Sequence, residues 1–262
     1  MNTVPVHVLD EGPADGPAMV LSGSLGSDLR MWDPQVPALL RAGFRVVRYD
    51  HRGHGSSPVP TGPYSLADLG GDVLAMLNRV GVRQAHFVGL SLGGMVGMWL
   101  AQHAAERLRT LTLCCTSVDL GQTGSYGSRA RLVRAEGTAG VAAGVVQRWF
   151  TPQWHNTHPD HIDFYENMVA ATPAEGYAAC CEAIETMDIA TGLSAIDVPV
   201  LVVAGENDQA TPPAHGSRIA DAVGHGRLHV VRPAAHLANV EQSEALTALI
   251  IRHASMQSAE TP

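Results

Sequence analysis

Short runs of apolar, often β-branched residues alternate along much of the chain with stretches of helical periodicity. The apolar runs cover residues 18–22, 44–49, 85–90, 110–115, 198–204 and 227–231. The main helical stretches cover residues 65–79, 92–104, 211–222 and 239–254. Most of the apolar runs are typical of strands buried on both faces of a sheet. Strands alternating with helices predict an α/β fold, a mostly parallel sheet flanked by helices, with residues 4–10 as an antiparallel edge strand.

The alternation stops between about residues 117 and 190. That segment opens with the turn-rich stretch SVDLGQTGSYGS and continues with helical patterns near residues 128–136, 138–149, 159–171 and 174–187. We expect such a helical insertion to cover the carboxyl edge of the strands, where open parallel sheets bind ligands. The chain is therefore predicted to have a core at residues 1–116 and 191–262 and a helical lid at residues 117–190.

Composition and charge limit the kinds of partner that this chain can bind. The 262 residues carry a formal net charge of −8, with 17 Lys and Arg residues and no basic run, whereas a nucleic-acid binder needs a concentrated basic surface. No apolar segment approaches the roughly 20 residues needed to cross a bilayer, and the N-terminus lacks the pattern of a signal peptide. We expect a cytoplasmic protein that binds neither nucleic acid nor membranes; its oligomeric state is left open.

Two groups of residues superficially suggest metal or redox sites. The four cysteines form the adjacent pairs Cys114/Cys115 and Cys180/Cys181, which fit neither a disulfide framework nor zinc-ligand spacing. The stretch DHRGHG at 50–55 lacks further ligands at a suitable spacing. We interpret the cysteines as small buried hydrophobic residues and the second group as a tight turn after a strand. No metal is expected.

A serine between glycines lies where the strand expected at 85–90 meets the next helix. The stretch GLSLG at 89–93 matches the nucleophile elbow G-x-S-x-G in its required context. A sharp turn there would strain the backbone of Ser91 and leave no room for a Cβ at positions 89 and 93. The alternative interpretation is a serine N-cap whose glycines allow close packing.

A nucleophilic serine needs a base, and the base needs an orienting acid. Asp208 follows the strand expected at 198–204, and His236 follows the last strand. With Ser91 they have the chain order Ser, Asp, His and lie at strand ends on one edge of the sheet. Asp119 is a second candidate for the acid, although an Asx turn in its turn-rich surroundings is a sufficient explanation.

An oxyanion needs two backbone amides. The first is expected from Leu92, because amides at a helix start have no partner within the helix. For the second we choose Ser24, in the loop after the strand at 18–22. Leu25 is the alternative, if that loop is aligned one residue further along.

Longer motifs occur along nearly the whole chain. They are LSGSLGSDLRMWDPQVPAL at 21–39, FRVVRYDHRGHGSS at 44–57, GLSLGGMVGMWLA at 89–101, ERLRTLTL at 106–113, RWFTP at 148–152, ATPAEGYAACCEAIETMD at 171–188 and AAHLANVEQ at 234–242. With these motifs the chain resembles the 3-oxoadipate enol-lactonases of the α/β-hydrolase superfamily, and the lid stretch at 171–188 is the most specific. It departs from that family at Gly23, where Asn is expected, and at His51, where Thr is expected.

The resemblance implies an α/β-hydrolase fold with a helical lid. It also implies hydrolysis of a small anionic substrate, 3-oxoadipate enol-lactone, in the β-ketoadipate pathway of aromatic degradation, without a cofactor. Two alternatives stay open because the fold does not select a substrate. One is another esterase, lactonase or perhydrolase on this scaffold, and the other is a non-catalytic ligand-binding protein of the same fold.

A carboxylate entering a site with little water needs a cation or several donors. The predicted lid carries Arg129, Arg131, Arg134 and Arg148, whereas the strand-end loops offer few cations. Arg134 and Arg148 lie beside apolar residues, and Arg148 directly precedes Trp149. We therefore expect Arg134, Arg148 and Trp149 to face inward and bind the substrate.

Overall fold

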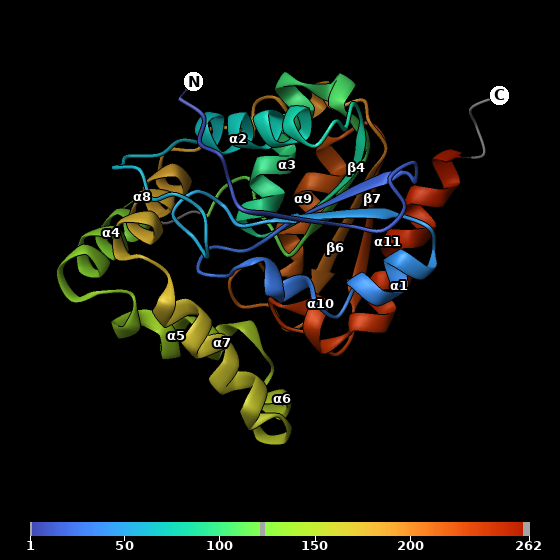
Figure 1. Ribbon diagram of the computed structural model, residues 1–262. Coiled ribbons are helices and arrows are strands. Elements are labelled where there is room, and N and C mark those ends of the chain that lie inside the picture. The colour runs from blue at the N-terminus through green and yellow to red at the C-terminus, as the bar shows by residue number, and fades with distance from the viewer. Residues whose placement is uncertain (1, 121–123, 259–262) are drawn as a thin grey trace.

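The computed structural model describes residues 2–120 and 124–258 (Figure 1). Within these residues a seven-stranded sheet has the order β1-β3-β2-β4-β5-β6-β7, and only β1 is antiparallel to its neighbour. The strands are β1 (Val8–Glu11), β2 (Ala18–Ser22), β3 (Arg45–Tyr49), β4 (Ala85–Leu90), β5 (Leu108–Cys114), β6 (Val200–Gly205) and β7 (Gly226–Val231). The predicted mostly parallel α/β sheet with an antiparallel edge strand is confirmed.

Helices cover both faces of this sheet. They are α1 (Val36–Arg41), α2 (Leu66–Arg79), α3 (Leu92–His103), α9 (Pro213–Ala222), α10 (Ala238–Glu241) and α11 (Ser243–Ser258). In Figure 1, α2 and α3 lie on one side of the sheet, and α1 and α11 lie on the other. All residues of the central strands β2, β4 and β6 are buried as a result, whereas the edge strand β7 alternates between more and less exposed residues.

One predicted helix is interrupted. The pattern at 239–254 forms two helices, α10 and α11, because Gln242 between them has φ −128° and ψ 50°, outside the helical region. This break sets α10 apart as a short turn next to His236. None of the helices in the described ranges combines the length and apolar character needed to cross a membrane.

Between β5 and β6 the described residues form five α-helices, which we call the helical block (residues 125–185). They are α4 (Ser125–Glu136), α5 (Ala139–Trp149), α6 (Pro152–Thr157), α7 (Pro159–Ala171) and α8 (Ala174–Glu185). Helix α4 packs on α8 and α5 packs on α7, to one side of the sheet (Figure 1). Helix α6 was not predicted, although Thr151 caps it and Pro152 begins it.

The segment predicted to be turn-rich, 117–128, overlaps α4, which already begins at Ser125. Residues 121–123 of that segment lie outside the described residues, as do residue 1 and residues 259–262 of the predicted core. The limits proposed for core and lid stay a prediction.

Helix α8 docks the block onto the core through a close approach of two backbones. A Cβ on Gly53, in the turn after β3, would lie 2.4 Å from the Cα of Gly176 on α8. The following residues of α8, from Tyr177 to Cys181, are fully buried. The stretch most specific to the family resemblance therefore includes the joint between block and core.

Candidate active site

Ser91 lies at the corner between β4 and α3. Its backbone has φ 55° and ψ −112°, a positive φ that a residue with a side chain rarely adopts. A Cβ on Gly89 would lie 2.2 Å from the carbonyl oxygen of Gly93, and a Cβ on Gly93 would lie 2.2 Å from that of Ser22. The predicted strain and the predicted need for glycine at both positions are confirmed.

Hydrogen bonds from both neighbouring strands hold this corner. The N–H of Ser91 donates to the carbonyl of Cys114 at 3.0 Å, and the hydroxyl of Thr116 donates to the carbonyl of Ser91 at 2.7 Å. On the other side, the N–H of Gly93 donates to the carbonyl of Gly23 at 2.9 Å. The surrounding structure therefore over-determines a conformation that by itself costs roughly 1–3 kcal/mol.

His236 and Asp208 form a buried pair. Nδ1 of His236 lies 2.8 Å from Oδ2 of Asp208, and the two side chains are 4% and 0% exposed. Burial by itself would raise the pKa of the Asp208 carboxyl, but the charge and hydrogen bond of His236 and the hydrogen bonds of Thr211 outweigh burial and lower it. An ionised Asp208 holds the proton on Nδ1, which leaves Nε2 of His236 as an acceptor.

Thr211 supports this pair and was not anticipated from the sequence. Its hydroxyl donates to Oδ2 of Asp208 at 2.7 Å, while Oδ1 accepts the N–H groups of Ala210 at 2.8 Å and Thr211 at 3.0 Å. This is a turn built around an aspartate side chain. The spacing Asp-x-x-Thr at 208–211, directly before a helix, was the available signal.

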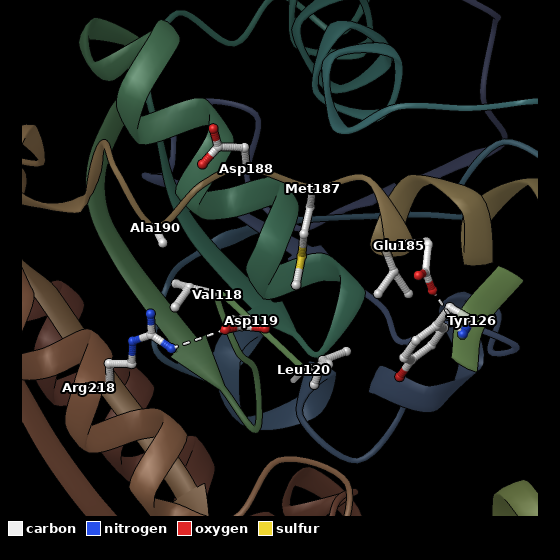
Figure 2. Close-up of a pocket in the computed structure, with 10 residues that line it drawn as sticks. Val118, Asp119, Leu120, Tyr126, Glu185, Met187, Asp188, Ala190 and Arg218 are labelled. Atoms are coloured by element: carbon white, nitrogen blue, oxygen red, sulfur yellow. Dashed lines mark hydrogen bonds and ion pairs between the residues drawn. The ribbon is translucent and has the colours of Figure 1, made fainter. Parts of the chain in front are cut away.

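Asp119, the second candidate for the acid, lies elsewhere. Its Oδ2 is 3.5 Å from Nη1 of Arg218 on α9, and both side chains are more than half exposed. It lines a separate hollow of about 220 Å³ together with Glu185, Asp188 and Arg218 (Figure 2). The carboxylate that contacts His236 is that of Asp208.

Ser91 and His236 line one cavity of about 360 Å³ between the strand ends and the helical block. Residues outside the helical block contribute further lining through Met95, Leu120 and Gln209. The block contributes Ser125, Tyr126, Arg129, Val145, Arg148, Trp149 and Tyr177. The cavity therefore combines a strand-end region that carries Ser91 and His236 with a wall of helices.

The loop after β2 contributes both candidates for the second oxyanion donor, Ser24 and Leu25, to the lining of the cavity. The N–H of Ser24 donates to Sδ of Met31 at 3.3 Å, which disfavours Ser24 as the oxyanion donor, and its role stays a prediction. Leu25, the predicted alternative, lines the cavity, and its N–H has no acceptor among the described residues. Leu92 is the first residue of α3, where amides lack an acceptor within the helix. Its role, like that of Leu25, stays a prediction.

Two histidines of the stretch at 50–55 contact the backbone of the loop after β2. Nε2 of His54 accepts the N–H of Gly26 at 3.0 Å, and Nε2 of His51 lies 3.1 Å from the carbonyl oxygen of Gly23. Burial, together with the nearby His54, lowers the pKa of His51 to about 3, so its ring is neutral. The histidines of the stretch at 50–55 therefore make internal contacts. The described parts of the chain hold no cluster of three His, Cys, Asp or Glu residues that could bind a metal ion.

The four cysteines are free and buried. Burial raises the pKa of the Cys114 and Cys181 thiols to about 12, and those of Cys115 and Cys180 also lie above their ordinary value. Protonated, buried thiols behave as small hydrophobic groups. The interpretation from their spacing is confirmed.

Two arginines of the helical block face the cavity. Arg148 and Trp149 line it as predicted, and so does Arg129, which was not among the preferred residues. Within residues 2–120 and 124–258, neither arginine has a carboxylate within ion-pair distance. Burial and the like charge of Arg129 lower the pKa of Arg148. The cavity thus has two cations without an anionic partner.

The orientation predicted for Arg134 is wrong. Its Nε lies 2.7 Å from Oε2 of Glu175, and its Nη1 pairs with Glu182, both on α8. Arg134 therefore joins α4 to α8 instead of facing the cavity. Arg131 is exposed and donates to the hydroxyl of Ser128 on the same helix.

Comparisons with known proteins agree with this arrangement. A family model described as the alpha/beta hydrolase fold matches residues 17–243. The chain is 40% identical to 3-oxoadipate enol-lactonase 2 of Acinetobacter baylyi over 89% of its own length and 87% of that protein. It is 32% identical to the protein named carbamate hydrolase RutD of Variovorax paradoxus, over 92% of each chain.

Among solved structures, the enol-lactonase from Burkholderia xenovorans LB400 superposes with a TM-score of 0.93 at 38% identity, covering 95% of this chain and 96% of that one. The resemblance to enol-lactonases found in the motifs is therefore confirmed at the level of the whole chain. With its family model, its relatives and its sheet topology in agreement, this chain belongs to the α/β hydrolase fold family and is a hydrolase.

Proposed function

We propose that this protein opens 3-oxoadipate enol-lactone to 3-oxoadipate, in the β-ketoadipate pathway, with Ser91, His236 and Asp208 as its catalytic triad. One observation carries the proposal: a single cavity contains Ser91 and the Asp208-bound His236 together with the unpaired Arg129 and Arg148. Nucleophilic attack on an ester needs the serine and its base. An anionic substrate needs the arginines.

In the first half-reaction, Oγ of Ser91 gives its proton to Nε2 of His236 and bonds to the lactone carbonyl carbon. The amides of Leu92 and Leu25 donate to the resulting oxyanion. The carbonyl carbon then loses its bond to the ring oxygen, which leaves as an enolate and takes the proton from His236. The enol ketonises, and Asp208 stabilises the imidazolium in the meantime.

In the second half-reaction, His236 takes a proton from water, whose oxygen bonds to the acyl carbon. The bond between that carbon and Oγ of Ser91 breaks, and His236 returns the proton to the serine. The product has two carboxylates, whereas the substrate has one.

The helical block then acts as a lid that selects the substrate. Arg129 and Arg148 bind the carboxymethyl arm through charge-assisted hydrogen bonds, and Trp149 packs beside it. A guanidinium in a partly buried site is well suited to this binding because it stays charged and can donate two hydrogen bonds to one carboxylate.

The test is a direct comparison of substrates for the purified protein. We expect kcat/KM for the enol-lactone to exceed that for uncharged esters and for carbamates of similar size by at least about 10-fold, the factor that 1.4 kcal/mol of arm binding provides. Faster turnover of an uncharged ester or a carbamate would replace the proposed substrate. Failure of Ser91 to react with a serine-directed phosphonate would instead indicate a non-catalytic protein.

A further inference from the structure

A buried carboxylate connects the loop of His236 to the helical block. Glu241, at the end of α10, is 7% exposed. Its Oε1 accepts the N–H of Thr151 at 2.8 Å and the hydroxyl of the same residue at 2.7 Å. Its Oε2 accepts the N–H of Ala235 at 2.5 Å. Because Ala235 directly precedes His236 and Thr151 directly follows the end of α5 and Phe150, one side chain joins two regions that are 84 or more residues apart in the chain.

A second hydrogen bond holds the other side of the same loop. The N–H of Leu237 donates to the carbonyl of Trp149 at 2.9 Å. The residues before and after His236 are therefore both tied to the segment 149–151 of the block. That segment begins with Trp149, which lines the cavity beside Arg148.

The three donors explain how Glu241 is tolerated inside the protein. In the described residues no cation lies within ion-pair distance of it, and an ionised carboxylate without a cation is costly to bury unless hydrogen bonds satisfy it. A glutamine of the same shape cannot replace it, because its NH₂ group would face an N–H group on one side or the other. The site therefore requires a carboxylate and not merely a polar side chain.

We propose that Glu241 is a positioning residue for His236 that holds the base in a fixed place relative to the substrate-binding wall of the block. Through Ala235 it sets the position of the base, and through Thr151 it ties that position to Arg148 and Trp149. A substrate held by its carboxylate arm then presents its carbonyl to Ser91 and His236 in a constant geometry. This inference rests on the triad proposed above.

The test is the substitution Glu241→Gln in the full-length protein. One measurement is the rate at which Ser91 reacts with an uncharged fluorophosphonate, in which Oγ bonds to phosphorus, fluoride leaves and His236 takes the proton. The other is kcat and KM for the enol-lactone. We expect the phosphonylation rate and kcat to fall about 10-fold or more, which corresponds to about 1.4 kcal/mol, while the circular dichroism spectrum is unchanged.

Gln242→Ala is the matched control. Its Nε2 donates to the carbonyl of the exposed Pro233 in the same loop at 2.8 Å, so its loss should leave both rates unchanged. Thr151→Val removes one donor to Glu241 and should slow phosphonylation by a smaller factor. Because both substitutions break the same contact, the double variant should lose less than the product of the two single losses.

Several outcomes overturn the proposal. Unchanged phosphonylation in folded Glu241→Gln would do so. A lowered melting temperature combined with normal rates at temperatures well below the melting point would do so too, because a purely structural role would produce that result. If Glu241→Gln does not fold, normal phosphonylation of Thr151→Val has the same consequence. The phosphonate reaction does not depend on the natural substrate, so a wrong substrate assignment would appear as normal labelling of the unaltered protein without lactone turnover.

Discussion

The strand-end loops and the helical block line the same cavity, but they place their side chains in different ways. Ser91 is set by the glycines of its own corner, and Asp208 by the amides two and three residues ahead. In the block, Arg134 is turned away from the cavity by partners on a helix 41 and 48 residues further along. Ser91 and Asp208 are therefore placed largely by local backbone geometry, whereas the groups assigned to substrate selection depend on how helices pack.

Ser91→Ala tests the strand-end region and has the largest expected effect. It removes one oxygen at a corner whose strain does not depend on that oxygen, so the fold should be intact. Turnover should fall by a factor on the order of 10⁶, as when the serine of another triad is removed, for charged and uncharged substrates alike. The measurement is kcat/KM on both, and near-normal hydrolysis of either would contradict the proposed mechanism.

Asp208→Asn and Asp119→Asn separate the two candidate acids. The first leaves His236 with the wrong tautomer and an unstabilised imidazolium, and should lower kcat by a factor on the order of 10⁴. The second alters an exposed pair with Arg218 and should change kcat by less than about 2-fold, as surface pairs contribute little. Initial rates of the two purified variants decide the matter, and the assignment fails if the Asp119 variant is the inactive one.

Arg148→Met tests the helical block. Loss of one charge-assisted contact should raise KM for the enol-lactone by about 10-fold or more, because about 1.4 to 3 kcal/mol of binding is lost, and should leave hydrolysis of an uncharged ester nearly unchanged. Arg134→Met is the matched control, because the same substitution outside the cavity should lower the melting temperature without raising KM. Equal losses of kcat/KM on charged and uncharged substrates would show that the helical block does not select substrates by their charge.

His51→Thr concerns the stability of the core and has the smallest effect. The pKa of His51 is about 3 in the folded protein and 6.5 when exposed, so the unfolded chain binds the extra proton between these values. The stability contributed by the neutral ring is complete above pH 6.5 and is lost as the pH falls below it. Replacing His51 with threonine, the residue expected in the family, removes this proton uptake. The unfolding free energy should then decline less steeply as the pH falls below 6.5, by up to about 1.4 kcal/mol per pH unit.

Urea unfolding at pH 5.0, 5.5, 6.0 and 7.5 measures that slope. The control is His225→Gln, because the His225 side chain is 67% exposed and substitutions at exposed positions usually change stability little. A His51→Thr variant with the original slope would show that other groups are responsible for the acid sensitivity.

Sequence alone determined the features that depend on neighbouring residues. The apolar runs predicted the buried strands because a strand covered on both faces cannot alternate with polar residues. The glycines around Ser91 predicted the corner because only a residue without Cβ fits there. The chain order and strand-end positions of Asp208 and His236 predicted that they would meet.

Only the tertiary structure decided which groups of the loops and helices face the cavity. Ser24 was chosen over its neighbour Leu25 from the alignment of the loop alone, and in the folded chain the N–H of Ser24 donates to the sulfur of Met31. Arg129 and Arg134 lie on one helix, and the glutamates of α8 turn the second away. These outcomes depend on contacts between distant segments, whose geometry no local pattern encodes, and for the same physical reason the link between Glu241 and Thr151 became visible only in the folded chain.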